Sequence, residues 1–235
     1  EVGSFNAGVL EVQGNYNGKI VGSGTHLVIL SGSTLQNIDN LKAQNLHIEN
    51  TSTEGVNFTG TSYIYGEIKN ENTPLNNGKS IHLYGGTIGG TRYIGDIRIE
   101  RYVSIKNDIE IIGDMYFYEN DAAHITISEN TDLTIQGNVN ADVYTTILDE
   151  SGMTIKSGAN VKVLGDFIVK STSKCTFVMG LSGTLVVNGD LTATTALKIN
   201  QNEGSYLKIC GNFTRGKEVG SFNAGVLEVQ GNYNG

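Results

Sequence analysis

Three aspartates hold the same place in a recurring phrase of the chain: Asp114, Asp166 and Asp190 each follow a glycine that ends a short apolar run. Paired carboxylates at matched positions act as general acid and base in sugar hydrolysis, and carboxylate oxygens also bind calcium. The same slot elsewhere holds asparagine, at Asn138, Asn212 and Asn232. Because asparagine turns a corner as well as aspartate but cannot transfer a proton, the pattern favours turn residues over a catalytic or calcium site.

The histidines and cysteines show no ligand spacing. Cys/His pairs and His-x-x-x-His motifs that would collect a metal are absent from the sequence, and the histidines occur singly at His26, His47, His82 and His124. Strand alternation places Cys175 inward and Cys210 outward, which disfavours a disulfide between them. We therefore expect no enzyme, with no catalytic, cofactor-binding or metal-binding residues and no cofactor.

Tyrosines supply a different kind of candidate. Alternation along the strands turns Tyr63 and Tyr65 outward, and Tyr84 and Tyr116 are expected to join them. An outward aromatic strip would stack sugar rings or bring two fibres together. Outward tyrosine is also ordinary in strands, so the pattern alone leaves both interpretations open.

These residues sit in a repeated phrase of the form apolar-x-apolar-x-Gly-Asn/Asp-apolar. Its clear copies cover residues 10–16, 109–115, 133–139, 161–167, 185–191, 207–213 and 227–233. Period-two alternation puts the first, third and seventh residues of each copy on one side, such as Leu185, Val187 and Leu191, with Val186 and Asp190 on the other. Each phrase therefore predicts a strand with an apolar inner side, followed by a corner where glycine supplies a bend or a positive φ.

The spacing of the phrases predicts the fold. Taking looser copies into account, one series of corner slots runs through positions 14, 32, 50, 66, 85, 113, 137, 165, 189, 211 and 231, and apolar strands at residues 124–127, 176–179 and 196–199 lie between the slots. The mean step of about 22 residues is the length of one coil of a parallel β-solenoid. We predict an all-β, right-handed parallel β-helix of about ten coils.

Three segments test this prediction against alternatives. Asn77-Gly78 is the main two-residue hairpin motif, which a β-sandwich built from hairpins would need in greater number. Leu35, Ile38 and Leu41 have helical spacing, although a coil is expected there. The glycine-rich residues 85–90 resemble a calcium-binding repeat but lack its aspartate and occur once, so we predict a loop.

The chain repeats its own beginning, because residues 218–235 are identical to residues 1–18. We expect a single solenoid segment over residues 1–235, in which residues 1–217 form one repeat period and residues 218–235 begin the next. Solenoids normally end in a capping element, and no capping helix or charged closing strand is recognisable at either end. Adjacent copies of the same repeat, joined end to end, are the expected partners.

Composition excludes several classes of function. A net charge of −8 disfavours nucleic acid as a partner. The sequence contains no apolar run long enough to cross a bilayer as a helix, so no membrane span is expected in this segment. The abundance of glycine (31 residues) with one proline and no tryptophan is typical of short strands joined by tight turns.

The recurring phrase, with strands such as residues 206–209 (YLKI) and 196–199 (ALKI), resembles the large secreted parallel β-helix repeat proteins of bacteria, which are adhesin-like or build filaments at the cell surface. The resemblance covers nearly all of the chain. It implies an extracellular location and a structural role in reach, stiffness and surface contact, with neighbouring filaments or cell-surface glycans as further partners. A carbohydrate-active β-helix enzyme or sugar-binding module is the alternative, and a phage tail-fibre segment is a third.

Overall fold

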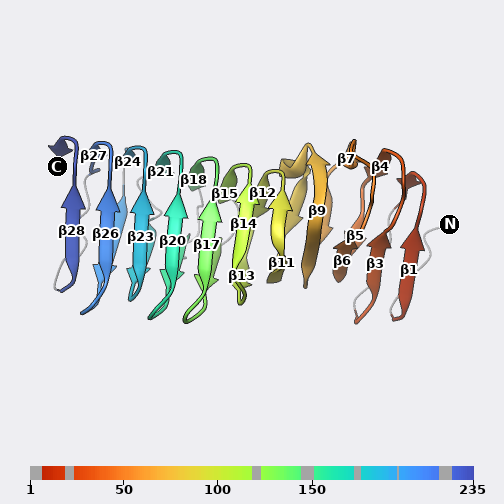
Figure 1. Ribbon diagram of the computed structural model, residues 1–235, viewed down its shortest axis with the longest axis horizontal. Helices are drawn as coiled ribbons and strands as arrows, with labels where there is room; N and C mark the ends of the chain where they lie inside the picture. Colours follow the sequence, from red (N-terminus) through yellow and green to blue (C-terminus); the bar gives the residue numbers. More distant parts are fainter. Residues whose placement is uncertain are drawn as a thin grey trace.

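A computed structural model describes residues 7–18, 24–117, 123–143, 151–171, 176–194, 196–216 and 224–235. These residues form 29 strands and one 3-10 turn, η1 (Gly78–Ser80), with no α-helix among them. The strands stack along one long axis as a parallel β-solenoid of about nine turns (Figure 1). Every strand pairing between described residues is parallel, so the β-solenoid prediction is confirmed and the hairpin sandwich is excluded.

Each coil places one strand in each of three hydrogen-bonded ladders. The first ladder runs through β1 (Val9–Val12), β3 (Leu27–Leu30), β6 (Asn45–Ile48), the start of β9 (Ile68–Asn76), the start of β11 (Gly86–Ile94), β13 (Tyr102–Ile105), β16 (His124–Ile127), β19 (Ser151–Ile155), β22 (Phe177–Leu181) and β25 (Leu197–Gln201). The three apolar strands expected between the phrases all lie in it.

The second ladder contains β2 (Tyr16–Asn17), β4 (Gln36–Asp39), β7 (Val56–Phe58), the ends of β9 and β11, β14 (Ile109–Ile112), β17 (Asp132–Ile135), β20 (Asn160–Val163), β23 (Thr184–Val187), β26 (Tyr206–Ile209) and β28 (Val226–Val229). Most copies of the repeated phrase fold here.

The third ladder contains β5 (Lys42–Ala43), β8 (Ser62–Ile64), β10 (Ile81–Leu83), β12 (Ile97–Ile99), β15 (Met115–Phe117), β18 (Val139–Val143), β21 (Phe167–Ser171), β24 (Leu191–Ala193), β27 (Phe213–Thr214) and β29 (Tyr233–Asn234). The stack of about nine turns is slightly shorter than the ten coils expected.

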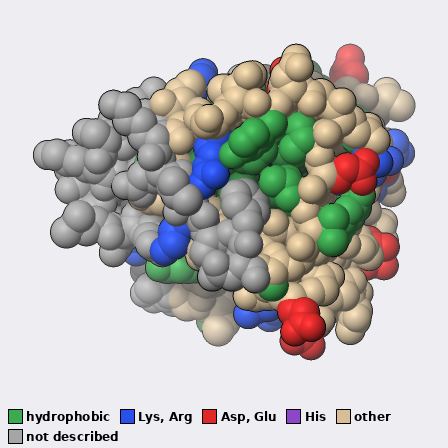
Figure 2. All heavy atoms as spheres, turned by 90° about the vertical axis from the view of Figure 1, so that its left-hand side faces the viewer, with side chains coloured by type: hydrophobic (Ala, Val, Ile, Leu, Met, Phe, Trp, Pro, Cys, Tyr) green, Lys and Arg blue, Asp and Glu red, His purple; other side chains and the backbone are tan. Residues whose placement is uncertain are grey.

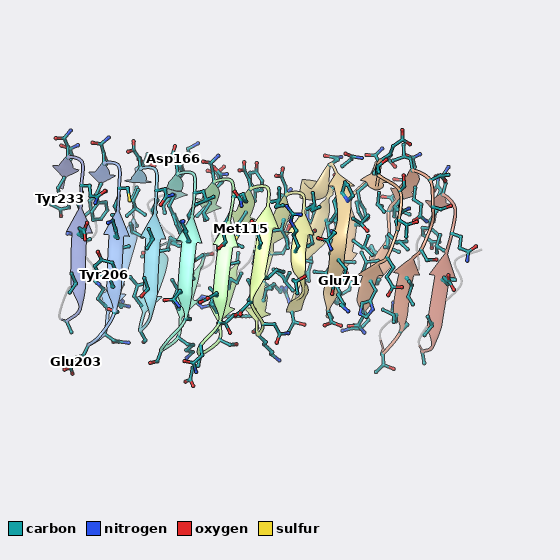
Figure 3. All side chains as sticks on the ribbon, in the orientation of Figure 1. Glu71, Met115, Asp166, Glu203, Tyr206 and Tyr233 are labelled. Carbon is teal, nitrogen blue, oxygen red and sulfur yellow. The ribbon has the colours of Figure 1, made fainter. Side chains whose placement is uncertain are left out.

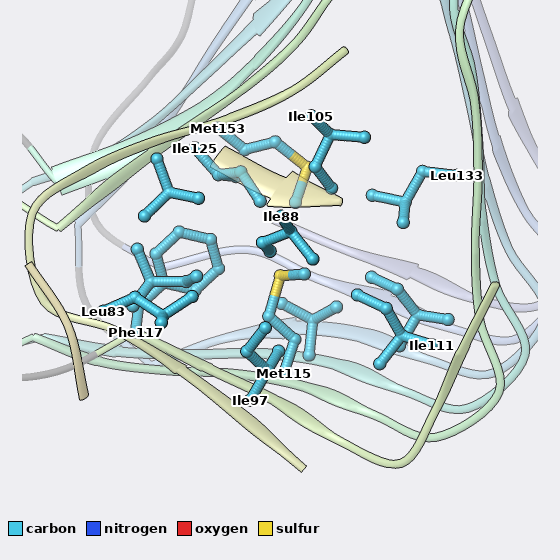
Figure 4. Packing of buried hydrophobic residues seen from close by; sticks show 14 of the residues in the cluster. Leu83, Ile88, Ile97, Ile105, Ile111, Met115, Phe117, Ile125, Leu133 and Met153 are labelled. Atoms are coloured by element: carbon cyan, nitrogen blue, oxygen red, sulfur yellow. The ribbon is translucent and has the colours of Figure 1, made fainter. Parts of the chain in front are cut away.

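The interior is a continuous apolar column made by the inward side of all three ladders. Leu185, Val187 and Leu191 are fully buried, which confirms the alternation derived from the phrase. Ile88, Ile111 and Met115 all project into this column, Ile88 from one coil and the other two from the next (Figure 4). Because each buried Leu, Ile or Val contributes about 1.5–3 kcal/mol, this column provides the main stabilisation of the stack.

Two of the three segments fold as the solenoid prediction requires, and the third differs from the loop that was predicted. Ile38 lies in strand β4 rather than in a helix, and Asn77 has a left-handed backbone (φ 59°) before the turn η1 rather than in a hairpin. The loop predicted for residues 85–90 is wrong, because Gly86 begins the nine-residue strand β11. Gly86 and Gly90 have φ values of 81° and 93°, and these left-handed positions let an irregular strand bend across two ladders.

The single series of corner slots is also corrected. Slots 113 to 231 share the corner between the second and third ladders. Slots 14, 32 and 50 lie at the corner between the first and second, and slots 66 and 85 at the corner between the third and first. Equal spacing in sequence does not identify which of three corners a glycine occupies, since every coil passes all three.

The two copies of the duplicated segment occupy different ladders. Val9–Val12 of the first copy pair with β3 in the first ladder, whereas Val226–Val229 of the second copy pair with β26 in the second. Both copies form a strand, a corner and a second short strand, and in both the leucine and the second valine pack against the core. The duplicated sequence therefore specifies strand, corner and strand, but not the ladder.

Candidate functional site

The aspartates of the repeated phrase form one hydrogen-bonded column along the corner between the second and third ladders. In this column, called here the Asx ladder, the side-chain Oδ1 of each coil accepts a hydrogen bond from the backbone N–H of the next coil at 2.6–3.0 Å. Its members are Asp96, Asp114, Asn138, Asp166, Asp190, Asn212 and Asn232. Asp166 lies at the outer edge of the stack, away from the interior (Figure 3).

The glycine before each member makes this column possible. The glycine N–H groups of successive coils donate to the glycine carbonyl below at 3.0–3.1 Å. A Cβ built on Gly189 would lie 2.8 Å from the carbonyl oxygen of Gly165 and would overlap Oδ1 of Asp166. Gly189 lies in a bend, as predicted, but it has no positive φ, so glycine is required there by the close approach of the neighbouring coil.

This geometry favours a structural role for the aspartates. Asp166 and Asp190 belong to successive coils, as predicted, and each uses one carboxylate oxygen to hold the next coil. The second oxygen of Asp114 accepts a hydrogen bond of 3.0 Å from the hydroxyl of Tyr116. Within the described ranges, no three His, Cys, Asp or Glu residues come together as a metal site would need. An aspartate and an asparagine fill the slot equally well because both supply the acceptor.

A second feature gathers aromatic side chains on the outward side of the third ladder. Tyr84 contacts Tyr63 edge to face at 5.5 Å between ring centroids and Tyr65 at 5.6 Å. Tyr63 also contacts the ring of His82 at 5.3 Å. Tyr65 is 41% exposed, and burial raises the pKa of its hydroxyl, so that the ring stays neutral near pH 7. The structure thus brings together three of the four tyrosines named from the sequence.

The fourth tyrosine lies further along the same ladder. Along the third ladder, the residues paired between neighbouring coils are, in order, Lys42, Tyr63, His82, Arg98 and Tyr116. Burial and the hydrogen bond to Asp114 raise the pKa of Tyr116. The outward side of the third ladder thus carries these five residues in five successive coils, a row called here the outward strip.

Cations flank the rings, and sequence reasoning missed them. The ammonium of Lys42 lies 5.1 Å from the Tyr63 ring centroid, and the guanidinium of Arg101 lies 5.6 Å from that of Tyr84, both within cation–π range. The strand register that brings Lys42 beside Tyr63 joins two different coils, so no local motif announces it. We call Lys42, Tyr63, Tyr65, Tyr84 and Arg101 the aromatic–cationic patch.

A buried carboxylate lies behind this patch. Glu100 is 1% exposed, and its Oε1 lies 2.5 Å from Nδ1 of His82 and 3.4 Å from Nε of Arg98. A carboxylate in such a position is stable only when it is paired with charge or hydrogen-bond donors. Glu100 was not singled out from the sequence, because residues 97–100 alternate regularly and parity assigns Glu100 to the outward side.

The remaining histidines have separate surroundings, as the sequence predicted. Nε2 of His47 lies 3.0 Å from Glu67, and Nε2 of His124 lies 3.0 Å from the hydroxyl of Thr154. His26 is fully buried, and its Nε2 accepts a hydrogen bond of 2.9 Å from the backbone N–H of Gln44. Desolvation lowers the pKa of His26, in keeping with a neutral ring that accepts this bond.

Of the two cysteines, the structure describes Cys210 and not Cys175. Cys210 is free and half-buried directly after β26. Cys175 lies outside the described residues.

In the N-terminal part of the stack a buried amide network lies at a different corner, between the first and second ladders. Gln36 donates to the carbonyl oxygens of Val12 and Gly14 at 2.9 Å each, and its Oε1 accepts from the Gly32 N–H at 3.1 Å and from Asn50 at 2.7 Å. The hydroxyl of Thr73 donates to the Asn50 carbonyl at 2.7 Å, which carries the network into the next coil. These residues are buried and fix one corner, so they are structural rather than a binding site.

Comparisons with known proteins identify no family for this chain. No protein-family model, no curated protein and no solved structure matches the chain. None of the described residues belongs to a helix with the length and apolar character needed to cross a membrane.

Proposed function

We propose that this chain is a structural repeat segment of an extracellular bacterial filament or giant adhesin, which supplies reach, stiffness and surface contact and has no enzymatic activity. Its partners are adjacent copies of the same repeat, joined end to end. The observation that carries the proposal is that the duplicated segment continues the ladders and the core of the stack.

The last coil supports this proposal. Val226 continues the backbone ladder with a hydrogen bond of 2.9 Å to Ser205, and Leu227 and Val229 pack against the core on one side only. Seen end on, hydrophobic side chains gather in the middle of this face (Figure 2). Val226 and Tyr233 remain 56% and 51% exposed. The second copy of the duplicated segment therefore stacks as a further coil on the one before it.

The alternative enzyme has weaker support in the residues. A hydrolase of this architecture would need carboxylates free to reach a substrate, whereas the stacked aspartates are acceptors within the Asx ladder. A sugar-binding role is compatible with the structural one, because both would use the outer surface.

The test is a chain that carries two full periods. If the second period continues the stack, small-angle scattering will give a rod whose largest dimension grows by about 50 Å per added period, at roughly 4.8 Å per coil. Two rods joined by a flexible linker would instead give a broad distribution of distances, and that result would contradict the proposal.

A matched pair of variants locates the junction. Leu10 and Leu227 hold the same place in the identical segments, but in the two-period chain only Leu227 lies between two periods. We expect Leu227→Asp to lower the denaturation midpoint of that chain far more than Leu10→Asp, because only the former buries a charge. Equal effects of the two substitutions would show that no coil covers Leu227.

A further inference from the structure

We propose that the aromatic–cationic patch binds a polysaccharide that carries carboxylate groups. Tyr65 and Tyr84 would lie against the sugar rings, and Lys42 and Arg101 would pair with the acid groups. This inference deepens the surface-contact part of the proposed function and does not require tandem copies.

The rings provide a rigid apolar surface on an otherwise polar exterior. Tyr63, Tyr65 and Tyr84 contact one another through their edges and faces, so each ring limits the movement of its neighbours. Tyrosine offers a large contact area with little loss of side-chain freedom, which favours binding of extended ligands.

Coil spacing suits a chain of sugars. Tyr63 and His82 are direct register partners in neighbouring coils, and the outward groups continue through Arg98 to Tyr116. Parallel strands repeat at about 4.8 Å, close to the length of one sugar unit in an extended polysaccharide. A polysaccharide lying along the axis would therefore meet a new outward side chain at each unit.

Charge points to an acidic ligand. The chain as a whole has a net charge of −8, yet the cationic residues Lys42, Arg98 and Arg101 lie in or beside the aromatic–cationic patch. Two acids lie beside them. Glu100 is buried against His82 and Arg98. Asp114 accepts a hydrogen bond from Tyr116. The nearby Glu67 pairs with His47 on the first ladder. So small a group of cations can pair with a few carboxylates of a polysaccharide, whereas a nucleic acid requires many phosphate contacts.

Glu100 supports the patch from behind through His82. Its carboxylate is almost fully buried beside His82 and Arg98, and the ring of His82 contacts that of Tyr63 at 5.3 Å. The Tyr63 ring of the patch therefore rests against a histidine that is paired with a buried carboxylate.

The experiment uses the full chain and isothermal titration calorimetry with three probes: polygalacturonate, dextran and a single-stranded thymidine oligonucleotide. We expect polygalacturonate to bind, with an affinity that falls as salt rises, and dextran to bind weakly or not at all. Tyr84→Ala and Arg101→Gln should each weaken binding by roughly tenfold or more. The matched controls Tyr206→Ala and Lys170→Gln, on other parts of the outer surface, should bind like the unmodified chain.

The other outcomes overturn the proposal. These are no binding of polygalacturonate, equal binding of dextran, tighter binding of the oligonucleotide, or equal losses in the patch and control variants. Self-association in sedimentation velocity that disappears in Tyr84→Ala would assign the patch to contact between copies instead. Tyr65→Phe, which keeps the ring, should retain binding and separates loss of the surface from loss of folding. A failure of the two-period chain to form one rod would leave this result unaffected.

Discussion

Two parts of the stack stabilise two different corners, the regular one between the second and third ladders and the irregular one between the first and second. From residue 95 onward, successive coils use a glycine followed by Asp or Asn, and the Asx ladder repeats with little change. In residues 7–94 the corners differ from coil to coil and rely on buried side chains such as Gln36, Asn50 and Thr73. The aromatic–cationic patch lies mostly in this irregular part.

The difference shows that the regular corner tolerates substitution, whereas the irregular corner depends on particular residues. A ladder in which each member has the same task accepts either Asp or Asn, because a neighbour in the next coil needs only one acceptor. A network used once has no such freedom, since each buried amide satisfies several particular partners. The irregular part therefore has room for distinctive surface chemistry, while its interior is less tolerant of change.

The largest expected effect is at Gln36. Gln36→Leu keeps the approximate volume but leaves the Val12 and Gly14 carbonyls, the Gly32 N–H and the Asn50 amide without this partner in a buried corner. We expect a loss of about 3–5 kcal/mol in the free energy of unfolding, measured by urea denaturation. Gln136→Leu, at an exposed outward position, is the control. A loss below about 1 kcal/mol would show that water replaces the network.

Gly189→Ala comes next and tests the regular part. The added methyl would overlap Asp166 Oδ1 and approach the Gly165 carbonyl, so either the Asx ladder or the glycine column must shift. We expect about 2–4 kcal/mol of destabilisation. Gly14→Ala is the matched control, because the same phrase there places nothing within 4 Å of the new methyl. Equal tolerance of both changes would refute the close-approach explanation.

Asp166 separates charge from hydrogen bonding. Asp166→Asn keeps the acceptor for the Asp190 N–H and should change stability by less than about 0.5 kcal/mol. Asp166→Leu removes the acceptor and should cost about 1–3 kcal/mol. Calcium should protect neither the unmodified chain nor the variants in thermal denaturation. Stabilisation by calcium that Asp166→Asn abolishes would restore the metal interpretation of this slot.

The smallest effect concerns pH in the irregular part. Because desolvation lowers the pKa of His26 below its usual value of about 6.5, the folded state favours the neutral ring. The stability that this ring contributes is present above about pH 6.5 and is lost as the pH falls below it. His26→Gln should therefore reduce the difference in unfolding free energy between pH 7.5 and pH 5. An unchanged difference would mean that other groups govern the acid response.

Sequence reasoning predicted the fold because the repeated phrase carries its main determinants locally. Alternation identified Leu185 and Val187 as core residues, and the shared slot of Asp166 and Asp190 gave the corner column. The irregular part was harder. Gly32 and Gly66 were assigned to one series although they lie at different corners, because pairing between coils decides the corner and is not written within a phrase.

The patch was predictable in outline only. Parity gave the outward tyrosines, since it depends on the strand alone. Lys42 and Arg101 could not be assigned to it, because each reaches its ring only through the stacking of one coil on another. The duplicated segment makes the same point, as identical residues occupy different ladders at the two ends.

The reciprocal form of the Asx ladder makes the coil an exchangeable unit of length. Each corner supplies an acceptor to the coil above and a donor to the coil below, so any glycine can precede any Asp or Asn of the series. Excision of residues 166–189 would join Gly165 directly to Asp190 and restore the phrase across the cut. Such a solenoid can lose or gain one coil at a time while the hydrogen bonds between the remaining coils are kept.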